Sequence, residues 1–387
     1  MTTPQRISQP ERPRRRPSRW VAGLLLAASV ALAAFQAGQR FAPVNLWDPL
    51  WVRAYLDRPI DTGAPGNGFW LSGYMVDYDR SSLEVVKTRS NHMDQVVVFG
   101  YGFDRAGKIV GNDYEIMRGV IGKSKRILLF GNLTNGNFDK ETSHAILTDR
   151  AVQDQAVKGM LERVAAMDAA GVQIDFENLA QGDRDAYTAF LKRLKDELAP
   201  KGLTLSVAAA AKTSDTRTGW GGATDYAAIG QIVDQFYIMA YDEHWSGGEP
   251  GPVASLPWVE KVVRYAISVM PSQKIILGVP FYGYDWGVDP NADKSKNKAV
   301  GSARMASKMS ELGATVKWDP VSGENVASYK TPDGGERVAW WPDQRSVEAK
   351  MKLAYQYNLR GVAPWRLGFE ADDWWDAMGA FRVQPSK

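Results

Sequence analysis

Two acidic residues separated by a single position stand in an otherwise apolar stretch, and their types and spacing suit acid–base chemistry. Residues 171–179 contain Asp175 and Glu177. Because side chains alternate along a strand, both acids share one face with Gln173. Burial and like-charge repulsion raise carboxyl pKa values, which favours one protonated and one ionised acid. General acid–base catalysis near neutral pH requires this division, although a hydrogen-bonded structural pair gives the same pattern.

The flanking sequence places these acids at the carboxyl end of a strand. A helix-like segment ends before Gly171, and a second helical pattern opens near Asp183. Its apolar residues follow helical spacing until Pro200 and Gly202 stop it: Tyr187, Phe190, Leu191, Leu194 and Leu198. In an α/β barrel the carboxyl ends of the strands carry the active site. The context therefore favours the catalytic interpretation.

The same stretch resembles glycoside hydrolase family 18, whose signature is Asp-Gly-x-Asp-x-Asp-x-Glu on the fourth barrel strand. Residues 170–177 read Ala-Gly-Val-Gln-Ile-Asp-Phe-Glu, so the last two acids match while Ala170 and Gln173 replace the first two. The form Gly-Val-x-Ile-Asp-Phe-Glu-Asn is most similar to the branch that cleaves peptidoglycan glycan strands in bacterial spore and cell-wall lysis. That branch also carries an amide in place of the middle Asp. The resemblance extends over residues 69–378.

Eight mostly apolar runs alternate with helical patterns, and they predict an α/β fold, a closed parallel (β/α)8 TIM barrel. The runs are Phe69–Asp77, Gln95–Phe103, Arg126–Leu133, Val172–Glu177, Leu203–Ala209, Gln235–Tyr241, Lys274–Phe281 and Leu359–Arg366. With 387 residues, 44% of them hydrophobic, the chain is long enough for one such barrel after the first sixty or so are set aside.

The interval between the seventh and eighth runs is too long for a simple connection. Short alternating runs at Ala314–Trp318, Ala327–Lys330 and Arg337–Trp341 predict antiparallel strands, with a turn at residues 332–335. We therefore expect a small α+β insertion after strand seven, at residues 287–341 of a barrel domain spanning 68–387. Family 18 enzymes often carry such an insertion there, where it forms one wall of the substrate cleft.

Two further strand ends resemble motifs of the family. Residues 237–242 read Tyr-Ile-Met-Ala-Tyr-Asp, which resembles the Met-x-Tyr-Asp motif and would bring Met239, Tyr241 and Asp242 to the barrel mouth. Residues 361–366 place Trp365 where the family typically has a tryptophan that forms the floor of a sugar subsite. Sugar rings present apolar faces, so an aromatic platform stabilises their binding. An ordinary core tryptophan is the alternative for Trp365.

The resemblance implies a substrate-assisted retaining mechanism, in which the 2-acetamido oxygen of the substrate attacks the anomeric carbon. Glu177 would act as general acid and later as base, and Asp175 would orient the acetamido group. Tyr241 would donate to the acetamido carbonyl, with Asp242 hydrogen-bonding the sugar nearby. This chemistry requires no metal or organic cofactor. Further residues expected to line the cleft are Gln173, Tyr74, Asn132, Tyr282 and the aromatic edge at Trp286.

Composition limits the other function classes. A net charge of +3 gives no reason to expect a nucleic-acid partner. The absence of cysteine excludes disulfides and thiolate metal sites. The three histidines, His92, His144 and His244, are scattered without metal-ligand spacing. His244 lies two residues beyond Asp242, where a hydrogen-bonding role in the loop is expected rather than a catalytic one.

The amino-terminal region predicts export. Residues 1–19 contain six arginines against one glutamate and form a basic cytoplasmic tail, and the uncharged segment 20–39 follows. At ~1.5 Å per residue this segment can just span a ~30 Å hydrocarbon core and anchor the chain in the bacterial inner membrane. A signal peptide cleaved after residues 31–33 and a core helix behind a disordered tail are the alternatives. Residues 40–67 form a linker, which leaves the catalytic domain in the periplasm, at the cell surface or secreted.

These observations, together with the family resemblance, predict a membrane-tethered or exported β-N-acetylhexosaminidase. Its substrate would be a glycan that contains N-acetylglucosamine, with peptidoglycan the first choice and chitin-type oligomers the second. A transglycosylase would differ mainly in the access of water to the intermediate. A non-catalytic, lectin-like barrel is the alternative from another class, but lectin-like members of the family usually lose the acid that Glu177 retains.

Overall fold

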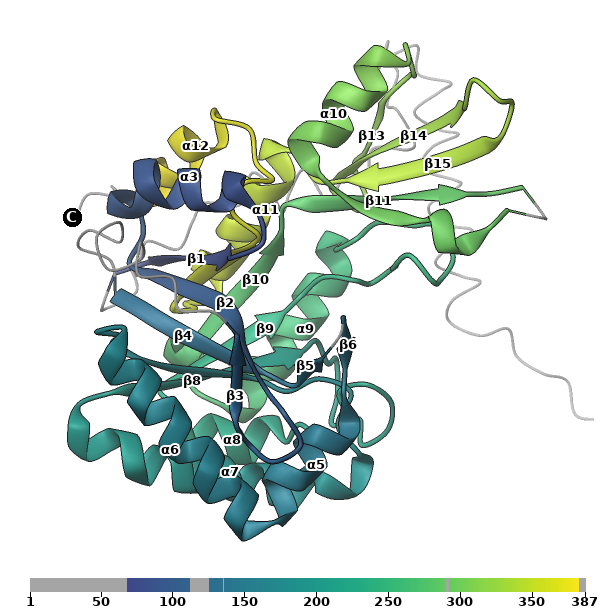
Figure 1. The fold of residues 1–387 in the computed structure, drawn as a ribbon. Helices are drawn as coiled ribbons and strands as arrows, with labels where there is room; N and C mark the ends of the chain where they lie inside the picture. Colours follow the sequence, from purple (N-terminus) through teal and green to yellow (C-terminus); the bar gives the residue numbers. More distant parts are fainter. Residues whose placement is uncertain (1–67, 112–124, 135, 290–291, 383–387) are drawn as a thin grey trace, which may run out of the picture. The chain divides into compact units, whose positions relative to one another are not determined.

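Eight parallel strands close into a barrel in the computed structural model, which describes residues 68–111, 125–134, 136–289 and 292–382 (Figure 1). The strands are β1 (Trp70–Val76), β2 (Gln95–Phe103), β4 (Lys125–Gly131), β7 (Gly171–Asp175), β8 (Thr204–Ala210), β9 (Gln235–Met239), β10 (Ile275–Pro280) and β16 (Gly361–Trp365). Strand β1 pairs in parallel with both β2 and β16, which closes the ring. The predicted barrel is therefore confirmed, and the predicted strand ends differ from the observed ones by at most two residues.

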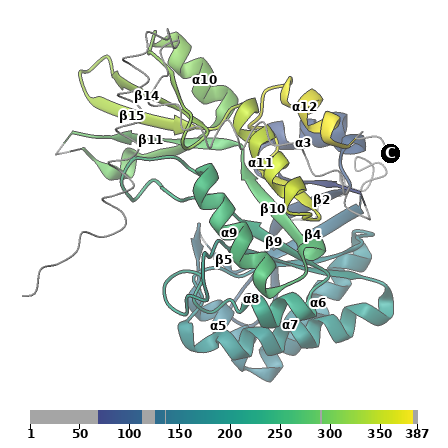
Figure 2. The ribbon, with the colours of Figure 1, turned by 180° about the vertical axis from the view of Figure 1, so that it is seen from behind.

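Helices surround the barrel, and Figure 2 shows α6, α7, α8, α9 and α11 on its outer side. They are α3 (Arg80–Arg89), α5 (Lys140–Thr148), α6 (Arg150–Ala166), α7 (Arg184–Leu198), α8 (Tyr226–Ile232), α9 (Leu256–Val269), α11 (Gln344–Gln356) and α12 (Trp374–Arg382). Single 3-10 turns lie at Ser90–His92, Gln181–Asp183, Ala199–Lys201, Ser272–Lys274 and Lys294–Lys296. All five apolar residues predicted for the inner side of α7 are buried.

Alternation along the strands separates two apolar cores. On β7, Val172 and Ile174 face outward and join the large core between barrel and helices. A smaller core inside the barrel contains alternate residues of other strands, including Val97, Leu129 and Ile276. This arrangement buries both faces of every strand and explains the nearly continuous apolar runs in the sequence.

The chain segment that connects β10 to β16 forms a second sheet. Its strand order is β12 (Lys298–Gly301), β11 (Tyr282–Gly287), β15 (Glu336–Trp341), β14 (Glu324–Lys330) and β13 (Lys317–Asp319), and α10 (Ser302–Glu311) accompanies it. The insertion is thus present, but it begins at Tyr282 instead of at the predicted residue 287. Only Phe281 separates β10 from β11, so the insertion begins almost directly where the barrel strand ends. Short strands also occur at β3 (Ile109–Gly111), β5 (Leu133–Thr134) and β6 (Asn137–Phe138).

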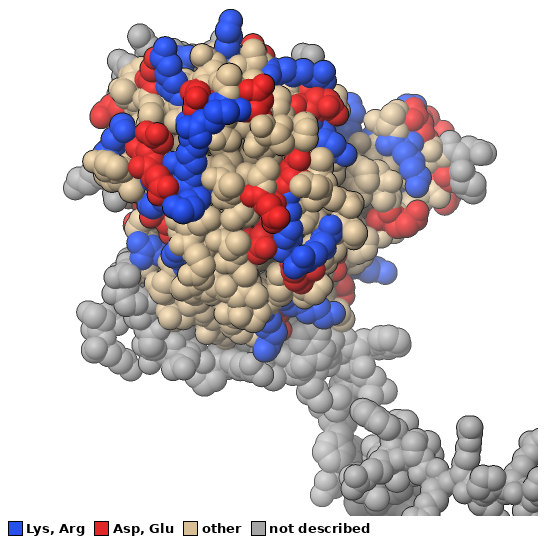
Figure 3. Space-filling view, turned by 90° about the horizontal axis from the view of Figure 1, so that it is seen from below, with Lys and Arg blue, Asp and Glu red and all other residues tan. Residues whose placement is uncertain are grey.

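The surface carries charges of both signs, and Figure 3 shows acidic and basic side chains interspersed over one face. Within the described part of the chain, no helix has the length and apolar character needed to cross a membrane. The predicted basic tail, the anchor or signal segment, and the linker lie outside the described residues.

Candidate active site

Asp175 and Glu177 both lie at the carboxyl end of β7. Asp175 is the last residue of the strand, and Glu177 follows two residues later. Between them, Phe176 points away and stacks on Phe190 of α7, with ring centroids 5.9 Å apart and nearly parallel planes. Burial of this ring against the helix fixes the alternation, so the two acids are directed to the barrel mouth as the spacing predicts.

Two side chains hold Glu177 in position. The fully buried Asn132 accepts a hydrogen bond from the Glu177 N–H at 2.9 Å and donates one to the Glu177 carbonyl oxygen, also at 2.9 Å. The indole Nε1–H of Trp220 donates to Oε2 of the Glu177 carboxylate at 2.8 Å. Backbone and carboxylate are therefore both fixed before any substrate binds.

The environment raises the pKa of both acids. Burial raises the pKa of Glu177 to about 7; the hydrogen bond from Trp220 opposes this shift, and the nearby Asp242 carboxylate adds to it. Burial, and then the charge of Glu177, raise the pKa of Asp175 well above its ordinary value. Oδ1 of Asp175 is buried without a hydrogen-bond partner among the described residues. A buried acceptor without a donor in the free protein is suited to receive one from a ligand.

Tyr241 and Asp242 follow β9 and extend the mouth. Asp242 has a left-handed backbone conformation, with φ of 63°. Its Oδ1 accepts hydrogen bonds from the hydroxyls of Tyr284, at 2.9 Å, and of Tyr282. Surrounding protein raises the pKa of Asp242, and these two hydrogen bonds oppose that shift. Gly278 on β10 packs closely against this segment, because a Cβ atom there would lie 2.5 Å from the Ile238 carbonyl oxygen and 3.0 Å from the ring of Tyr241.

Trp365, the last residue of β16, contributes an aromatic surface at the mouth. Its ring packs edge-to-face against Tyr74, with centroids 5.2 Å apart, and against Phe99, at 5.5 Å. The ring is half-buried, as is the side chain of Met239 at the end of β9. Both residues therefore lie at strand ends where the sequence placed them, with part of each side chain accessible.

Four residues expected to line the cleft support the site from within instead. Tyr74 is 3% exposed and donates a hydrogen bond to Gln173 at 2.9 Å; Gln173 is fully buried and also bonds Ser206 at 3.3 Å. Asn132 holds the backbone of Glu177, and Tyr282 holds Asp242. Because polar side chains inside a barrel must satisfy one another, these inward positions bring structural hydrogen bonds. Contact of these four residues with a substrate stays a prediction.

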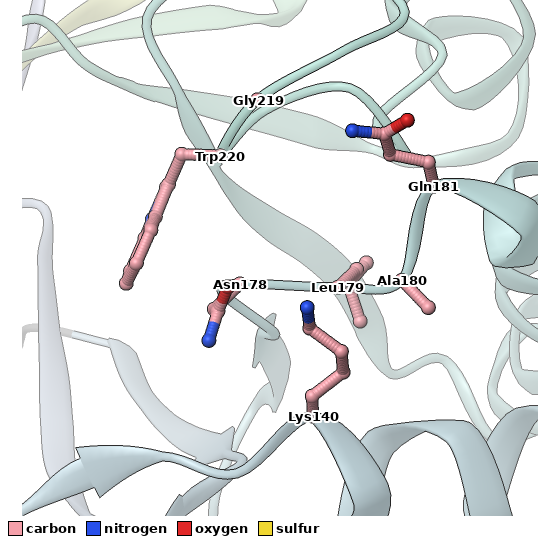
Figure 4. Close-up of a pocket in the computed structure, with 7 residues that line it drawn as sticks. All are labelled: Lys140, Asn178, Leu179, Ala180, Gln181, Gly219 and Trp220. Atoms are coloured by element: carbon pink, nitrogen blue, oxygen red, sulfur yellow. The ribbon is translucent and has the colours of Figure 1, made fainter.

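Three exposed aromatic residues that the sequence analysis did not single out follow barrel strands at their carboxyl ends, and one of them, Trp220, contacts Glu177. Tyr78, Trp220 and Trp245 are 68%, 52% and 56% exposed, and they follow β1, β8 and β9. Trp220 also lines a pocket of about 420 Å³, together with Lys140, Asn178, Leu179, Ala180, Gln181 and Gly219 (Figure 4). The sequence offered one signal, since a tryptophan between two glycines in a polar segment has no apolar neighbours with which to form a core.

Each histidine has a partner of its own. Nδ1 of His244 is 2.9 Å from the carbonyl oxygen of Pro252, which is the loop hydrogen bond expected for it. His144 contacts Asp183, and His92 packs edge-to-face on Trp375. No group of three or more His, Cys, Asp or Glu side chains in the described ranges is placed to hold a metal ion.

Comparisons with known proteins agree with this geometry. Residues 123–370 match the model of the glycosyl hydrolases family 18. The chain is 30% identical to a cortical fragment-lytic enzyme of Bacillus subtilis over 76% of this chain and 68% of that protein. Its fold is similar to the crystal structure of the Bacillus cereus spore cortex-lytic enzyme SleL, with a TM-score of 0.76, 27% identity and coverage of 82% and 75%. A chitinase from Chromobacterium violaceum gives a TM-score of 0.75 at 27% identity, covering 82% of this chain and all of that one. The chain spans 59–68% of the length of the cortical fragment-lytic enzymes that it matches.

Proposed function

The chain belongs to glycosyl hydrolase family 18, and from this premise we propose that it hydrolyses β-glycosidic bonds of glycans containing N-acetylglucosamine. Peptidoglycan is the first substrate, which the names of the cortex-lytic relatives support, and chitin-type oligomers are the second. The observation that carries the proposal is the acid pair itself: Glu177, with a pKa of about 7, lies two residues from a buried Asp175 whose Oδ1 has no donor among the residues that the structure describes.

In the first step, the carbonyl oxygen of the substrate's 2-acetamido group attacks the anomeric carbon. The bond from this carbon to the glycosidic oxygen breaks, and that oxygen takes a proton from Glu177. Asp175 accepts a hydrogen bond from the acetamido N–H at its free Oδ1 and stabilises the positive charge of the oxazolinium ion. Tyr241 donates to the acetamido oxygen, and Trp365 packs under the sugar ring.

In the second step, water attacks the anomeric carbon of the oxazolinium ion. The ionised Glu177 takes a proton from this water, the ring opens to regenerate the acetamide, and Glu177 is again an acid. A pKa near 7 suits both steps, because the same group must give and then accept a proton. The product retains the anomeric configuration.

We further propose that the domain acts outside the cytoplasm. The apolar segment 20–39 and the basic residues before it support an anchor in the inner membrane, with secretion after signal cleavage as the alternative. Peptidoglycan lies on that side of the membrane, so the proposed location and the proposed substrate agree.

Digestion of purified peptidoglycan by the full chain tests the function, with products identified by mass spectrometry and Glu177→Gln as the control. We expect fragments with N-acetylglucosamine at new reducing ends, and their loss in the variant by at least about 1,000-fold. Fragments from the variant at the wild-type rate would exclude Glu177 as the acid. Binding without cleavage of peptidoglycan or chitin oligomers would favour the lectin-like alternative, and enlarged products would indicate transglycosylation.

A further inference from the structure

A lysine that forms no ion pair with any acid among the described residues reaches into the pocket beside Glu177. Lys140 is the first residue of α5 and is exposed. Figure 4 shows its side chain extending toward the segment that carries Asn178 and Leu179, with Trp220 across from it. Lys140 also lines a second pocket of about 500 Å³, so it stands where the two hollows meet. Each volume lies in the range of roughly 300–1,000 Å³ typical of small-molecule sites.

The charge of Lys140 is not compensated by the residues around it. Only one of the described residues lining the two pockets is acidic, namely Asp139. Its carboxylate caps α5, accepts a hydrogen bond from the Thr142 hydroxyl at 2.8 Å and forms an ion pair with Arg105 at 3.2 Å. Arg105 therefore balances Asp139, and the ammonium group of Lys140 remains available. The amino-terminal end of α5 adds partial positive charge at the same place.

The pocket adjoins the atom that Glu177 would protonate. Trp220 donates its indole hydrogen to Glu177, and the same residue lines the pocket. Asn178 follows Glu177 directly in the chain and lies in the pocket wall. The residues proposed to hold the cleaved N-acetylated sugar, Asp175 and Trp365 among them, do not line it. Glu177 thus stands between two binding regions, as an acid that protonates the oxygen linking two sugars must.

We propose that this pocket binds the sugar on the leaving side of the cleaved bond and that Lys140 binds a carboxylate carried by that sugar. The inference rests on the proposed function and narrows its substrate class to an anionic, N-acetylated glycan. The indole of Trp220 covers the apolar face of the sugar ring, while the ammonium group supplies a charge-assisted hydrogen bond. In peptidoglycan, the carboxylate comes either from the lactyl ether of the sugar or from the peptide attached to it.

Substitution of Lys140 in the full chain, measured on three substrates, tests the proposal. The substrates are glycan strands with their peptides, strands stripped by an amidase to free lactyl carboxylates, and a neutral N-acetylglucosamine hexamer. We expect Lys140→Met to lower kcat/KM about ten-fold on the carboxylate-bearing strands, because one charge-assisted hydrogen bond is lost. On the hexamer the change should be less than about two-fold, because the hexamer carries no charge to lose. A fall in kcat/KM on the stripped strands would identify the lactyl carboxylate as the group that Lys140 binds. A fall on the intact strands alone would identify a carboxylate of the peptide.

Two controls separate charge from structure. Lys140→Arg keeps the charge and should keep the selectivity, and Lys158→Met removes an exposed lysine of the outer helix α6 and should change nothing. Raising the ionic strength should shrink the advantage of the anionic strands, because an exposed charge is screened by salt. Equal losses on neutral and anionic substrates, or no loss on any, would overturn the inference while leaving hydrolysis intact.

The inference remains testable if the proposed function fails. If the wild-type chain releases no product from any substrate, calorimetry can measure binding instead. The ligands are the stripped strands and the hexamer, and the proteins are Glu177→Gln and the double variant Glu177→Gln/Lys140→Met. The inference predicts weaker binding of the anionic strands alone. Unchanged binding of both ligands would overturn it.

Discussion

The barrel mouth and the insertion both bury carboxylates, but in the described part of the chain the buried carboxylates of the insertion lie against cations, whereas Asp175 at the mouth does not. Asp285 on β11 is 3% exposed, pairs with Arg337 at 2.7 Å and also contacts Lys308. At the mouth, Asp175 is 4% exposed, and the causes that raise its pKa are burial and another acid. Removing one member of a buried ion pair is strongly destabilising, because the other charge is left unpaired, whereas a buried acid without a cation already costs stability and marks a candidate functional site.

The two faces of β11 differ in the same way, one lined by neutral aromatic side chains and the other by an acid paired with cations. Along β11, Tyr282, Tyr284 and Trp286 alternate with Asp285 and point to the barrel mouth, where the two tyrosines bond Asp242. Asp285 points the other way, into the charged interior of the insertion. The insertion thus holds Asp242 at the mouth with neutral hydroxyls, whereas its cations Arg337 and Lys308 pair with Asp285.

The strongest test of this contrast is Asp175→Asn. Turnover should fall by about 100-fold or more, because an amide stabilises the oxazolinium ion less than a carboxylate. Stability should change in the opposite direction. A carboxyl whose pKa is raised by folding supports the fold fully at low pH and loses that contribution as pH rises through its folded value. The variant should therefore melt at a higher temperature than wild type at pH 8, with little difference at pH 4. Unchanged turnover would remove Asp175 from the catalytic set.

Substitution of a paired carboxylate should have the opposite effects, lowering stability and leaving most of the turnover. Glu324 of the insertion and Lys350 of α11 are both fully buried, 3.5 Å apart, and Glu324 also accepts hydrogen bonds from the N–H groups of Val253 and Ala254. Glu324→Gln should lower the free energy of unfolding by about 3–5 kcal/mol, because it leaves a buried cation unpaired. Turnover per folded molecule should fall far less than in Asp175→Asn. Denaturant titration measures the stability, and the double variant Glu324→Leu/Lys350→Met should recover much of it. A loss below about 1 kcal/mol would contradict the contrast.

Smaller effects are expected in the pH dependence of kcat/KM. The kcat/KM should fall as pH rises through about 7, because Glu177 must be protonated to act as an acid. Trp220→Phe removes a hydrogen bond that lowers this pKa, so the midpoint should move to higher pH. Asp242→Asn removes a charge that raises it, so the midpoint should move to lower pH. Trp245→Phe, which changes an exposed tryptophan of the mouth, is the matched control and should leave the midpoint in place. Shifts in the reverse directions would contradict the electrostatic account.

Local patterns were sufficient to predict the barrel and the acid pair. The alternation around Asp175 and Glu177, and the apolar periodicity of α7, are encoded within a few residues, so they could be read without tertiary information. The start of the insertion could not be predicted, because β11 follows β10 after a single residue and its pairing partner β15 is distant in sequence.

The roles of individual polar residues were harder to predict. Asn132 and Gln173 lie at the expected strand positions, yet whether such a side chain faces solvent or another polar group depends on strands far away in the chain. Trp220 was missed for the same reason. Its contact with Glu177 joins loops 43 residues apart, and no periodic pattern marks that contact.

In the proposed mechanism, the substrate's own acetamido group attacks the anomeric carbon while Glu177 donates the proton. Digestion of partially de-N-acetylated chitin oligomers tests it most directly, with the sugar at each new reducing end identified by mass spectrometry. Every new reducing end should carry an N-acetyl group, because the attacking oxygen belongs to that sugar. New reducing ends without the acetyl group, at the frequency found in the starting oligomers, would contradict the claim.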